Sequence, residues 1–170
     1  MKRLTLLLVL LVASFSFAQS LEDFIVETRG DTLVIKPTTF DAQLTGINSL
    51  GNAIIADTND VGVRDNPNRV YLLQRGQYYV HNQAFDLPEG TLIRIIGEPN
   101  PKSTQPPVIL PAPDAEGTVV IFNYRFQSSI AVENVYFNMA ALNGEFSQYP
   151  ISVYKDSVTI TVKNCVFEYG

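Results

Sequence analysis

The side chains of this sequence that could do acid–base chemistry on a regular β-surface lie in two matching segments. Ser129–Phe137 reads SIAVENVYF, and Thr159–Phe167 reads TITVKNCVF. Apolar and polar residues alternate in both, so one face of each strand is predicted to be buried, and the other carries Glu133 or Lys163. Because these two residues hold equivalent positions, we expect a cross-strand ion pair. A catalytic acid–base pair is the alternative.

Three further residues are candidates for binding a substrate. Glu145 and Tyr149 belong to the segment NMAALNGEFSQY, which we expect to be a loop between two strands, and loops carry function more often than cores do. Tyr136 is expected on the outer side of its strand, and Tyr124 and Tyr154 are weaker candidates for the same kind of position. Exposed tyrosine rings suit stacking on sugar rings, and cross-strand packing is their other use.

Neither a metal site nor a nucleophile is predicted. His81 is the only histidine, and its place at the end of a β-rich run favours a surface or loop position. Cys165 falls at an inward position and is interpreted as a core residue. The polar loop Asp57–Asn68 resembles a calcium-binding loop, but it has Val61 and Asn68 where that template needs ligands, so a solvated loop is expected. The residues themselves identify no cofactor.

The first eighteen residues are typical of a secretory signal peptide. Lys2 and Arg3 precede the apolar run Leu4–Phe17, and small residues stand before a cleavage site near Ala18. The run is shorter than the roughly 20 residues that span a bilayer, so no membrane insertion is expected. We predict a secreted or periplasmic protein. Removing two basic residues takes the net charge from −5 to −7, which argues against nucleic-acid partners.

The rest of the sequence predicts an all-β protein with a short extension before it. In the extension, residues 19–46, Phe24–Pro37 reads as a hairpin that turns at Gly30. Ile47–Asp57 is the one helical pattern, and Asn48 or Ser49 is expected to cap it. From Val70 onward, short β-rich runs alternate with Gly, Pro, Asn and Asp.

A repeat of thirty residues indicates stacked units. Ile121–Phe137 aligns without gaps on Ile151–Phe167, with six of seventeen positions identical. A fainter copy places Ile93, Ile95 and Gly97 opposite Ile130, Val132 and Asn134. The apolar phase shifts at Asn134, at Asn164 and at Gly97, so we expect a sharp corner there, in the left-handed backbone conformation that Asn and Gly tolerate. The Asn amides are expected to hydrogen-bond from one unit to the next.

These motifs resemble those of the right-handed parallel β-helix of the pectate-lyase-like superfamily. RVYLLQRGQYY is similar to its opening strand, TLIRIIGEP to the next strand, and the two nine-residue segments to its repeated turns. The resemblance covers residues 47–170. It implies a β-helix whose N-terminal end is closed by the short helix, in a secreted protein that binds or degrades polysaccharide.

The resemblance also implies what else the protein would need. If it is an enzyme, the family suggests a polysaccharide lyase or a glycoside hydrolase, with calcium in the lyases, and the catalytic groups would lie outside this chain. The alternative is a non-catalytic extracellular adhesion or structural module. The last repeat lacks a capping element, so we expect the chain to be the front portion of a longer protein and to self-associate through its last unit.

Overall fold

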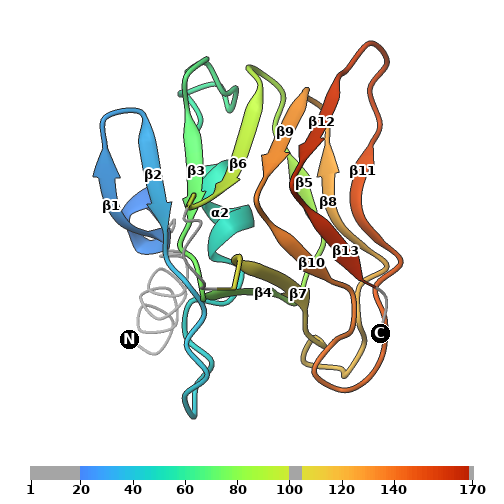
Figure 1. Cartoon of the computed structure of the whole chain (residues 1–170). Coiled ribbons are helices and arrows are strands. Elements are labelled where there is room, and N and C mark those ends of the chain that lie inside the picture. Colours follow the sequence, from blue (N-terminus) through green and yellow to red (C-terminus); the bar gives the residue numbers. More distant parts are fainter. Residues whose placement is uncertain (1–19, 100–104, 169–170) are drawn as a thin grey trace, which may run out of the picture.

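Strands make up most of the regular structure, so the predicted all-β class is confirmed. The computed structural model describes residues 20–99 and 105–168 (Figure 1). One α-helix and one short 3-10 helix accompany thirteen strands in these residues. The predicted signal peptide, residues 1–18, lies outside the described residues.

The hairpin and the helix form near the predicted places. A 3-10 helix η1 (Leu21–Phe24) leads into strand β1 (Ile25–Arg29), which pairs antiparallel with β2 (Thr32–Ile35). Gly30 supplies the positive φ of the turn, 59°. Helix α2 (Ser49–Ala56) is shorter than predicted at both ends. Asn48 precedes it in a left-handed conformation, and no side chain caps the helix start, so the expected capping by Asn48 or Ser49 is wrong.

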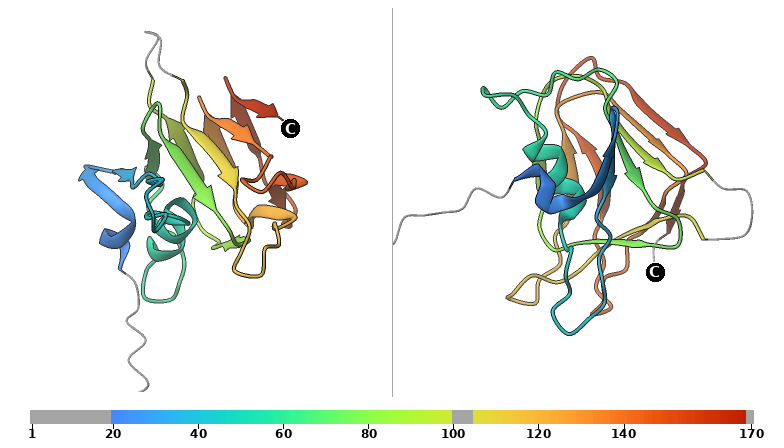
Figure 2. Two further views of the ribbon diagram at one scale, coloured as in Figure 1. Left: turned by 90° about the horizontal axis from the view of Figure 1, so that it is seen from below. Right: turned by 90° about the vertical axis from the view of Figure 1, so that its left-hand side faces the viewer.

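The remaining strands visit three sheets in a fixed rotation. They are β3 (Val70–Leu73), β4 (Tyr78–His81), β5 (Phe85–Leu87), β6 (Ile93–Gly97), β7 (Val108–Pro111), β8 (Phe122–Phe126), β9 (Ile130–Glu133), β10 (Tyr136–Asn138), β11 (Tyr149–Val153), β12 (Ile160–Lys163) and β13 (Val166–Glu168). The sheets have the orders β1-β2-β3-β6-β9-β12, β13-β10-β7-β4 and β11-β8-β5, and all pairs except β1–β2 are parallel (Figure 2). We call each passage through the three sheets a circuit: β3–β5, β6–β8, β9–β11 and finally β12–β13.

The strand register confirms the repeat in part. In the six-stranded sheet Ile93 pairs with Ile130 and Ile130 with Ile160, as the alignment predicts. In the three-stranded sheet, however, Ile151 pairs with Tyr124 rather than with residue 121. The offset there is therefore 27 residues, because the connection that follows β11 is longer than the one that follows β8. The gapless alignment of the first half of the repeat is wrong.

The core lies between the sheets and follows the strand alternation. Inward side chains of β3, β6 and β9 are almost fully buried, with Tyr71, Ile95 and Val132 at 0–1% exposure. Helix α2 closes the N-terminal side by burying Leu50 and Ile54 in the same cluster. The first three circuits thus share one continuous apolar interior.

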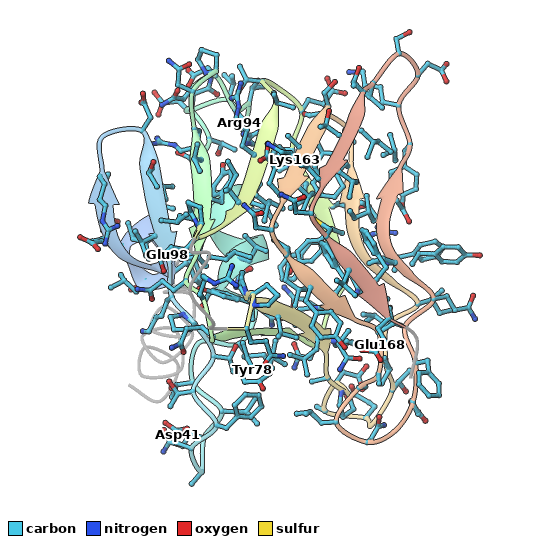
Figure 3. The ribbon with its side chains drawn as sticks, viewed as in Figure 1. Asp41, Tyr78, Arg94, Glu98, Lys163 and Glu168 are labelled. Carbon is cyan, nitrogen blue, oxygen red and sulfur yellow. The ribbon has the colours of Figure 1, made fainter. Side chains whose placement is uncertain are left out.

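A second, smaller apolar cluster lies on the outer face of the sheet that contains β4, β7 and β10. Val80, Val108, Leu110 and Ala112 are buried there, under Leu44 and Ile47 of the segment that precedes α2 and beside Tyr136. In Figure 3, Tyr78 lies under strand β4, beside the loop that carries Asp41. The segment before the helix is therefore packed onto the sheet.

Candidate functional site

The repeated asparagines form a hydrogen-bonded column at the corner between two sheets. Asn134 and Asn164 follow β9 and β12 and have φ values of 57° and 52°. The Asn164 side-chain amide donates to Asn134 Oδ1 at 3.3 Å, and the Asn134 amide donates to the Gly97 carbonyl at 3.4 Å. The geometry matches the predicted corner, and its role is structural because each amide serves the neighbouring circuit.

Gly97 occupies the third corner for a different reason. Its φ is not positive, so the predicted left-handed conformation at this residue is wrong. A Cβ added here would lie 2.1 Å from the Asn134 carbonyl oxygen and 2.8 Å from Pro107. Glycine is needed at this corner because the next circuit approaches the backbone closely.

The charged pair of the two repeats is an ion pair. Lys163 Nζ lies 3.4 Å from Glu133 Oε2, with both side chains on the outer face of the six-stranded sheet. Each charge has its partner on the adjacent strand, as expected for a cross-strand pair. This arrangement explains both residues without a catalytic role.

A pair of stacked, exposed aromatic rings lies at the start of β8 and β11. The ring centroids of Phe122 and Tyr149 are 5.1 Å apart, and the ring planes are 13° from parallel. Phe122 is 37% exposed and Tyr149 48%. The two residues pair in register, so the parallel strands hold the rings one above the other. The sequence indicates Tyr149 but not Phe122, because the gapless alignment of the repeat does not place Phe122 beside it.

Ile121 adjoins this aromatic pair, as the residue directly before Phe122. The backbone N–H groups of Gln148 and Tyr149 donate to the Ile121 carbonyl, which ties the loop after β10 to the start of β8. Ile121 itself, Leu142 and Phe146 are about half exposed. We call Ile121, Phe122 and Tyr149 the aromatic platform.

Charged residues lie farther along the same strands. Asp86, Arg125 and Ser152 are in register on β5, β8 and β11. The Arg125 guanidinium pairs with Asp86 and lies 5.7 Å from the centre of the Tyr154 ring. Just after β11, Lys155 Nζ lies 2.7 Å from Oε2 of Glu89, which lies just after β5. These cations are matched by carboxylates, and Tyr154 is exposed, as the sequence suggested.

The other predicted aromatics are less accessible. Tyr136 is half-buried and packs against the outer apolar cluster, which leaves only part of its ring accessible. Tyr124, expected as a possible outward residue, is 2% exposed and stacks on Phe85 in the core. Glu145 is exposed in the loop after β10, and its backbone N–H donates to the Asn143 side chain.

His81 is buried, so its predicted surface position is wrong. It belongs to β4, is 0% exposed and lies 5.4 Å from the Tyr124 ring. Neither ring nitrogen has a hydrogen-bond partner within 3.5 Å among the described residues. Burial lowers the pKa of His81 to about 4, and the nearby Asn123 side chain opposes this only in part. The imidazole is therefore neutral at pH 7.

The predicted solvated loop Asp57–Asn68 is anchored at both ends. The Arg69 guanidinium binds Asp57 with distances of 2.7 and 2.9 Å, and Tyr71 donates to the same carboxylate at 2.8 Å. Arg64, 2% exposed, donates to the Tyr71 hydroxyl and to the Thr91 carbonyl. Most of the loop, including residues 59–63, is exposed as predicted, whereas Asp57 and Arg64 tie its ends to the first circuit.

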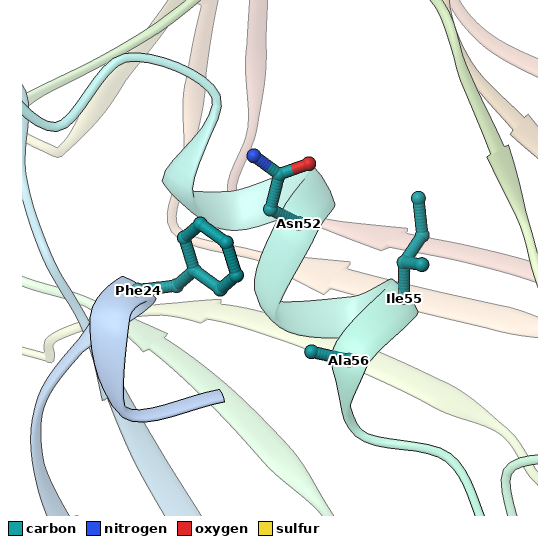
Figure 4. A pocket seen from close by; sticks show the side chains of 4 residues that line it. All are labelled: Phe24, Asn52, Ile55 and Ala56. Atoms are coloured by element: carbon teal, nitrogen blue, oxygen red, sulfur yellow. The ribbon is translucent and has the colours of Figure 1, made fainter. Parts of the chain in front are cut away.

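A hollow of about 200 Å³ is lined by Phe24, Asn52, Ile55 and Ala56, and Figure 4 shows Phe24 directed toward helix α2. None of the predicted site residues lines it. Residues 20–99 and 105–168 contain no group of three or more His, Cys, Asp or Glu side chains that could hold a metal ion. No helix in these ranges is long and apolar enough to cross a membrane.

No family model, curated protein or solved structure matches the chain.

Proposed function

We propose that this is a secreted protein that binds polysaccharide through the aromatic platform. The observation that carries the proposal is the exposed, nearly parallel stack of Phe122 and Tyr149. Sugar rings present flat faces of C–H groups, which pack favourably on the faces of aromatic rings. Parallel strands hold the two rings in a fixed relation, so little conformational freedom is lost when a sugar binds.

We also propose that the circuits form a right-handed parallel β-helix of the pectate-lyase-like kind. Support comes from the fixed rotation through three parallel sheets and from the hydrogen-bonded column of Asn134 and Asn164. Stacked circuits of this kind offer an extended lateral surface that suits a long, repetitive ligand. A polysaccharide is such a ligand.

Binding is favoured over degradation for these residues because their charges are already paired. Arg125 faces Asp86, and Lys163 faces Glu133. Cross-strand pairing accounts for all four charged residues as structural contacts, so none of them has to be assigned to catalysis. The proposal therefore makes no use of calcium or of a catalytic set within this chain.

Affinity electrophoresis and calorimetry on a panel of neutral and acidic polysaccharides test the proposal. Phe122→Ala and Tyr149→Ala should each weaken binding to the preferred polymer by roughly 3- to 10-fold, the value of one aromatic contact. Phe40→Ala is the matched control, since Phe40 is an equally exposed aromatic that packs edge-on against Tyr78. Binding that survives the loss of both platform rings would refute the site.

The same panel also tests the choice of binding over degradation. The purified chain should produce neither unsaturated products absorbing at 235 nm nor new reducing ends. Clear turnover of any polymer by this chain would show that a catalytic set is present and that the ion pairs have been misinterpreted.

A further inference from the structure

A group of buried polar side chains lies next to the aromatic platform along the chain. His81, Asn123 and Ser147 are 0%, 1% and 0% exposed, and they come from β4, from β8 and from the loop after β10. Neither ring nitrogen of His81 has a hydrogen-bond partner among the described residues. Unpartnered polar groups are rare in protein interiors and costly, so this imidazole needs an explanation.

Ser147 and Asn123 hold the loop after β10 against the start of β8. The Ser147 hydroxyl lies 2.6 Å from Asn123 Oδ1 and 3.0 Å from the Ile121 carbonyl oxygen. That carbonyl also accepts the backbone N–H groups of the two residues that follow Ser147. Because Asn123 directly follows Phe122, these contacts help to hold the Tyr149 ring over the Phe122 ring. We call the Ser147–Asn123 pair the latch.

Asn123 also links the latch to His81. Its side chain raises the pKa of the imidazole, which means that it interacts better with the charged ring than with the neutral ring. A protonated imidazole has two N–H donors and no acceptor. It therefore competes for the Asn123 oxygen to which the Ser147 hydroxyl donates.

The elements packed around His81 offer no charge that could stabilise a protonated ring. Tyr124, with its ring centre 5.4 Å away, is the titratable group that faces His81, and it stays neutral because burial raises its pKa. Strand β7 and helix α2, which both pack on β4, carry no ionisable side chain. The charged groups on the other neighbouring elements are paired, hydrogen-bonded within their own loop or exposed: Asp86, Arg125, Asp114, Glu116 and Glu145. Among the described residues, burial and Asn123 are the influences on the pKa of His81.

We propose that protonation of His81 releases the latch, so that acid weakens polysaccharide binding at the aromatic platform. This regulation rests on the proposed function of the platform, whereas release of the latch is a property of the chain itself. While the imidazole is neutral, Asn123 accepts from Ser147, and Tyr149 remains over Phe122. When the ring takes up a proton from solvent, the Asn123 oxygen turns to it, Ser147 loses its partner and the loop after β10 opens.

Hydrogen exchange of the unmodified chain tests the latch without any sugar. The N–H groups of Gln148 and Tyr149 donate to the Ile121 carbonyl, so their exchange reports opening of the loop. The pKa of His81 is about 4 in the core and about 6.5 when solvated, so opening becomes up to roughly 20-fold more favourable between pH 7 and pH 5. After correction for the intrinsic effect of pH, protection of these two amides should fall by roughly 5- to 20-fold.

Two amides of another loop are the matched control. The Asn59 N–H donates to the Val63 carbonyl and the Gly62 N–H to the Asn59 carbonyl, in a stretch that contains neither His81 nor a latch residue. Their protection should change by less than roughly 2-fold, because their local opening leaves His81 buried. Unchanged protection at Gln148, or an equal loss in both loops, would overturn the proposal. His81→Leu should abolish the loss, since leucine cannot take up a proton.

Binding of polygalacturonate and of a neutral β-glucan at pH 7 and pH 5 tests the effect on function. A polymer that binds at pH 7 should bind at least roughly 3-fold more weakly at pH 5, in proportion to the opening of the loop, and His81→Leu should remove this difference. Ser147→Ala should weaken binding at pH 7, because it removes the latch without removing a platform ring. Ser128→Ala is the matched control, since Ser128 is a buried serine that donates to the Pro88 carbonyl at 3.2 Å.

The outcomes separate the regulation from the proposed function. Binding that is equally strong at both pH values, with a platform confirmed by its ring variants, would overturn the regulation alone. Failure of both polymers to bind at pH 7 would count against the proposed function, and the exchange experiment would still show whether His81 controls the latch.

Discussion

At the scale of single residues, the corner between two sheets shows two solutions to one geometric problem. Asn134 and Asn164 adopt positive φ and connect the circuits through their amides. Gly97 stands at the equivalent position with an ordinary φ and is needed because the Asn134 carbonyl lies so near. A corner residue can thus be selected by its own backbone conformation or by the proximity of the next circuit.

We predict that Asn134→Ala lowers the free energy of unfolding by about 1–3 kcal/mol, because a Cβ residue is strained at positive φ and the amide hydrogen bonds are lost. Asn134→Gly should cost less, since glycine keeps the conformation and loses only the amide. Asn164→Ala should cost less than Asn134→Ala, as Asn164 is exposed on the last circuit. Urea unfolding measures all three, and equal stability of the Ala and Gly variants would show that conformation does not matter here.

His81 makes stability depend on pH in a defined range. Its pKa is about 4 in the folded chain and about 6.5 when unfolded, so between these values the unfolded chain binds one proton more. The contribution of His81 to the free energy of unfolding is fully present above pH 6.5 and is lost as the pH falls toward 4. The loss amounts to about 3 kcal/mol at most. An NMR titration of the single histidine should give a pKa well below 6. A normal value would mean that the ring is solvated.

At the scale of elements, helix α2 shows tertiary packing overriding intrinsic propensity. Gly51 lowers helix propensity, yet the helix forms because its buried face closes the core. A Cβ at residue 51 would lie 2.4 Å from the ring of Phe85, which is itself buried and stacked on Tyr124. The glycine therefore allows the helix to approach β5.

Gly51→Ala should accordingly destabilise the protein by about 1–3 kcal/mol, because overpacking outweighs a gain in helix propensity of about 1 kcal/mol. Asn52→Ala, one position along the same helix and only partly buried, should change stability by less than about 0.5 kcal/mol. Thermal unfolding by circular dichroism distinguishes the two. A stabilised Gly51→Ala variant would show that Phe85 yields without cost.

At the scale of the whole molecule, the two ends of the three sheets differ in what covers them. The N-terminal end has α2, the hairpin and the network around Asp57, whereas the last circuit has exposed apolar side chains. In the proposed β-helix each circuit is stabilised mainly by its neighbours, so a circuit with one neighbour unfolds most readily.

We therefore predict a gradient of amide protection along the stack. In dilute solution, hydrogen exchange of the unmodified chain should be slowest in β3 and β6, intermediate in β9 and fastest in β12 and β13, because local opening begins where fewest contacts must break. Exchange measured by mass spectrometry resolves these strands. Uniform protection across all circuits would indicate a single cooperative unit rather than a stack.

The sequence by itself determined what depends on local pattern. Alternating apolar residues set the inward faces of β9 and β12, and the repeat of thirty residues set their register. The phase shift at Asn134 and Asn164 located the corner, because the residue type required for positive φ is visible in the sequence. The Glu133–Lys163 pair followed from that same register.

Only the tertiary structure decided what depends on residues distant in sequence. The connections after β8 and β11 differ in length, so the register in their sheet is 27 residues, and this brings Phe122 onto Tyr149. His81 is buried because β8 brings the Tyr124 ring against it, which no pattern around residue 81 reveals. Asp57 joins Arg69 and Tyr71 because the loop between them folds back on the first circuit. Local sequence sets conformation and facing, whereas loop lengths and long-range packing determine which faces meet.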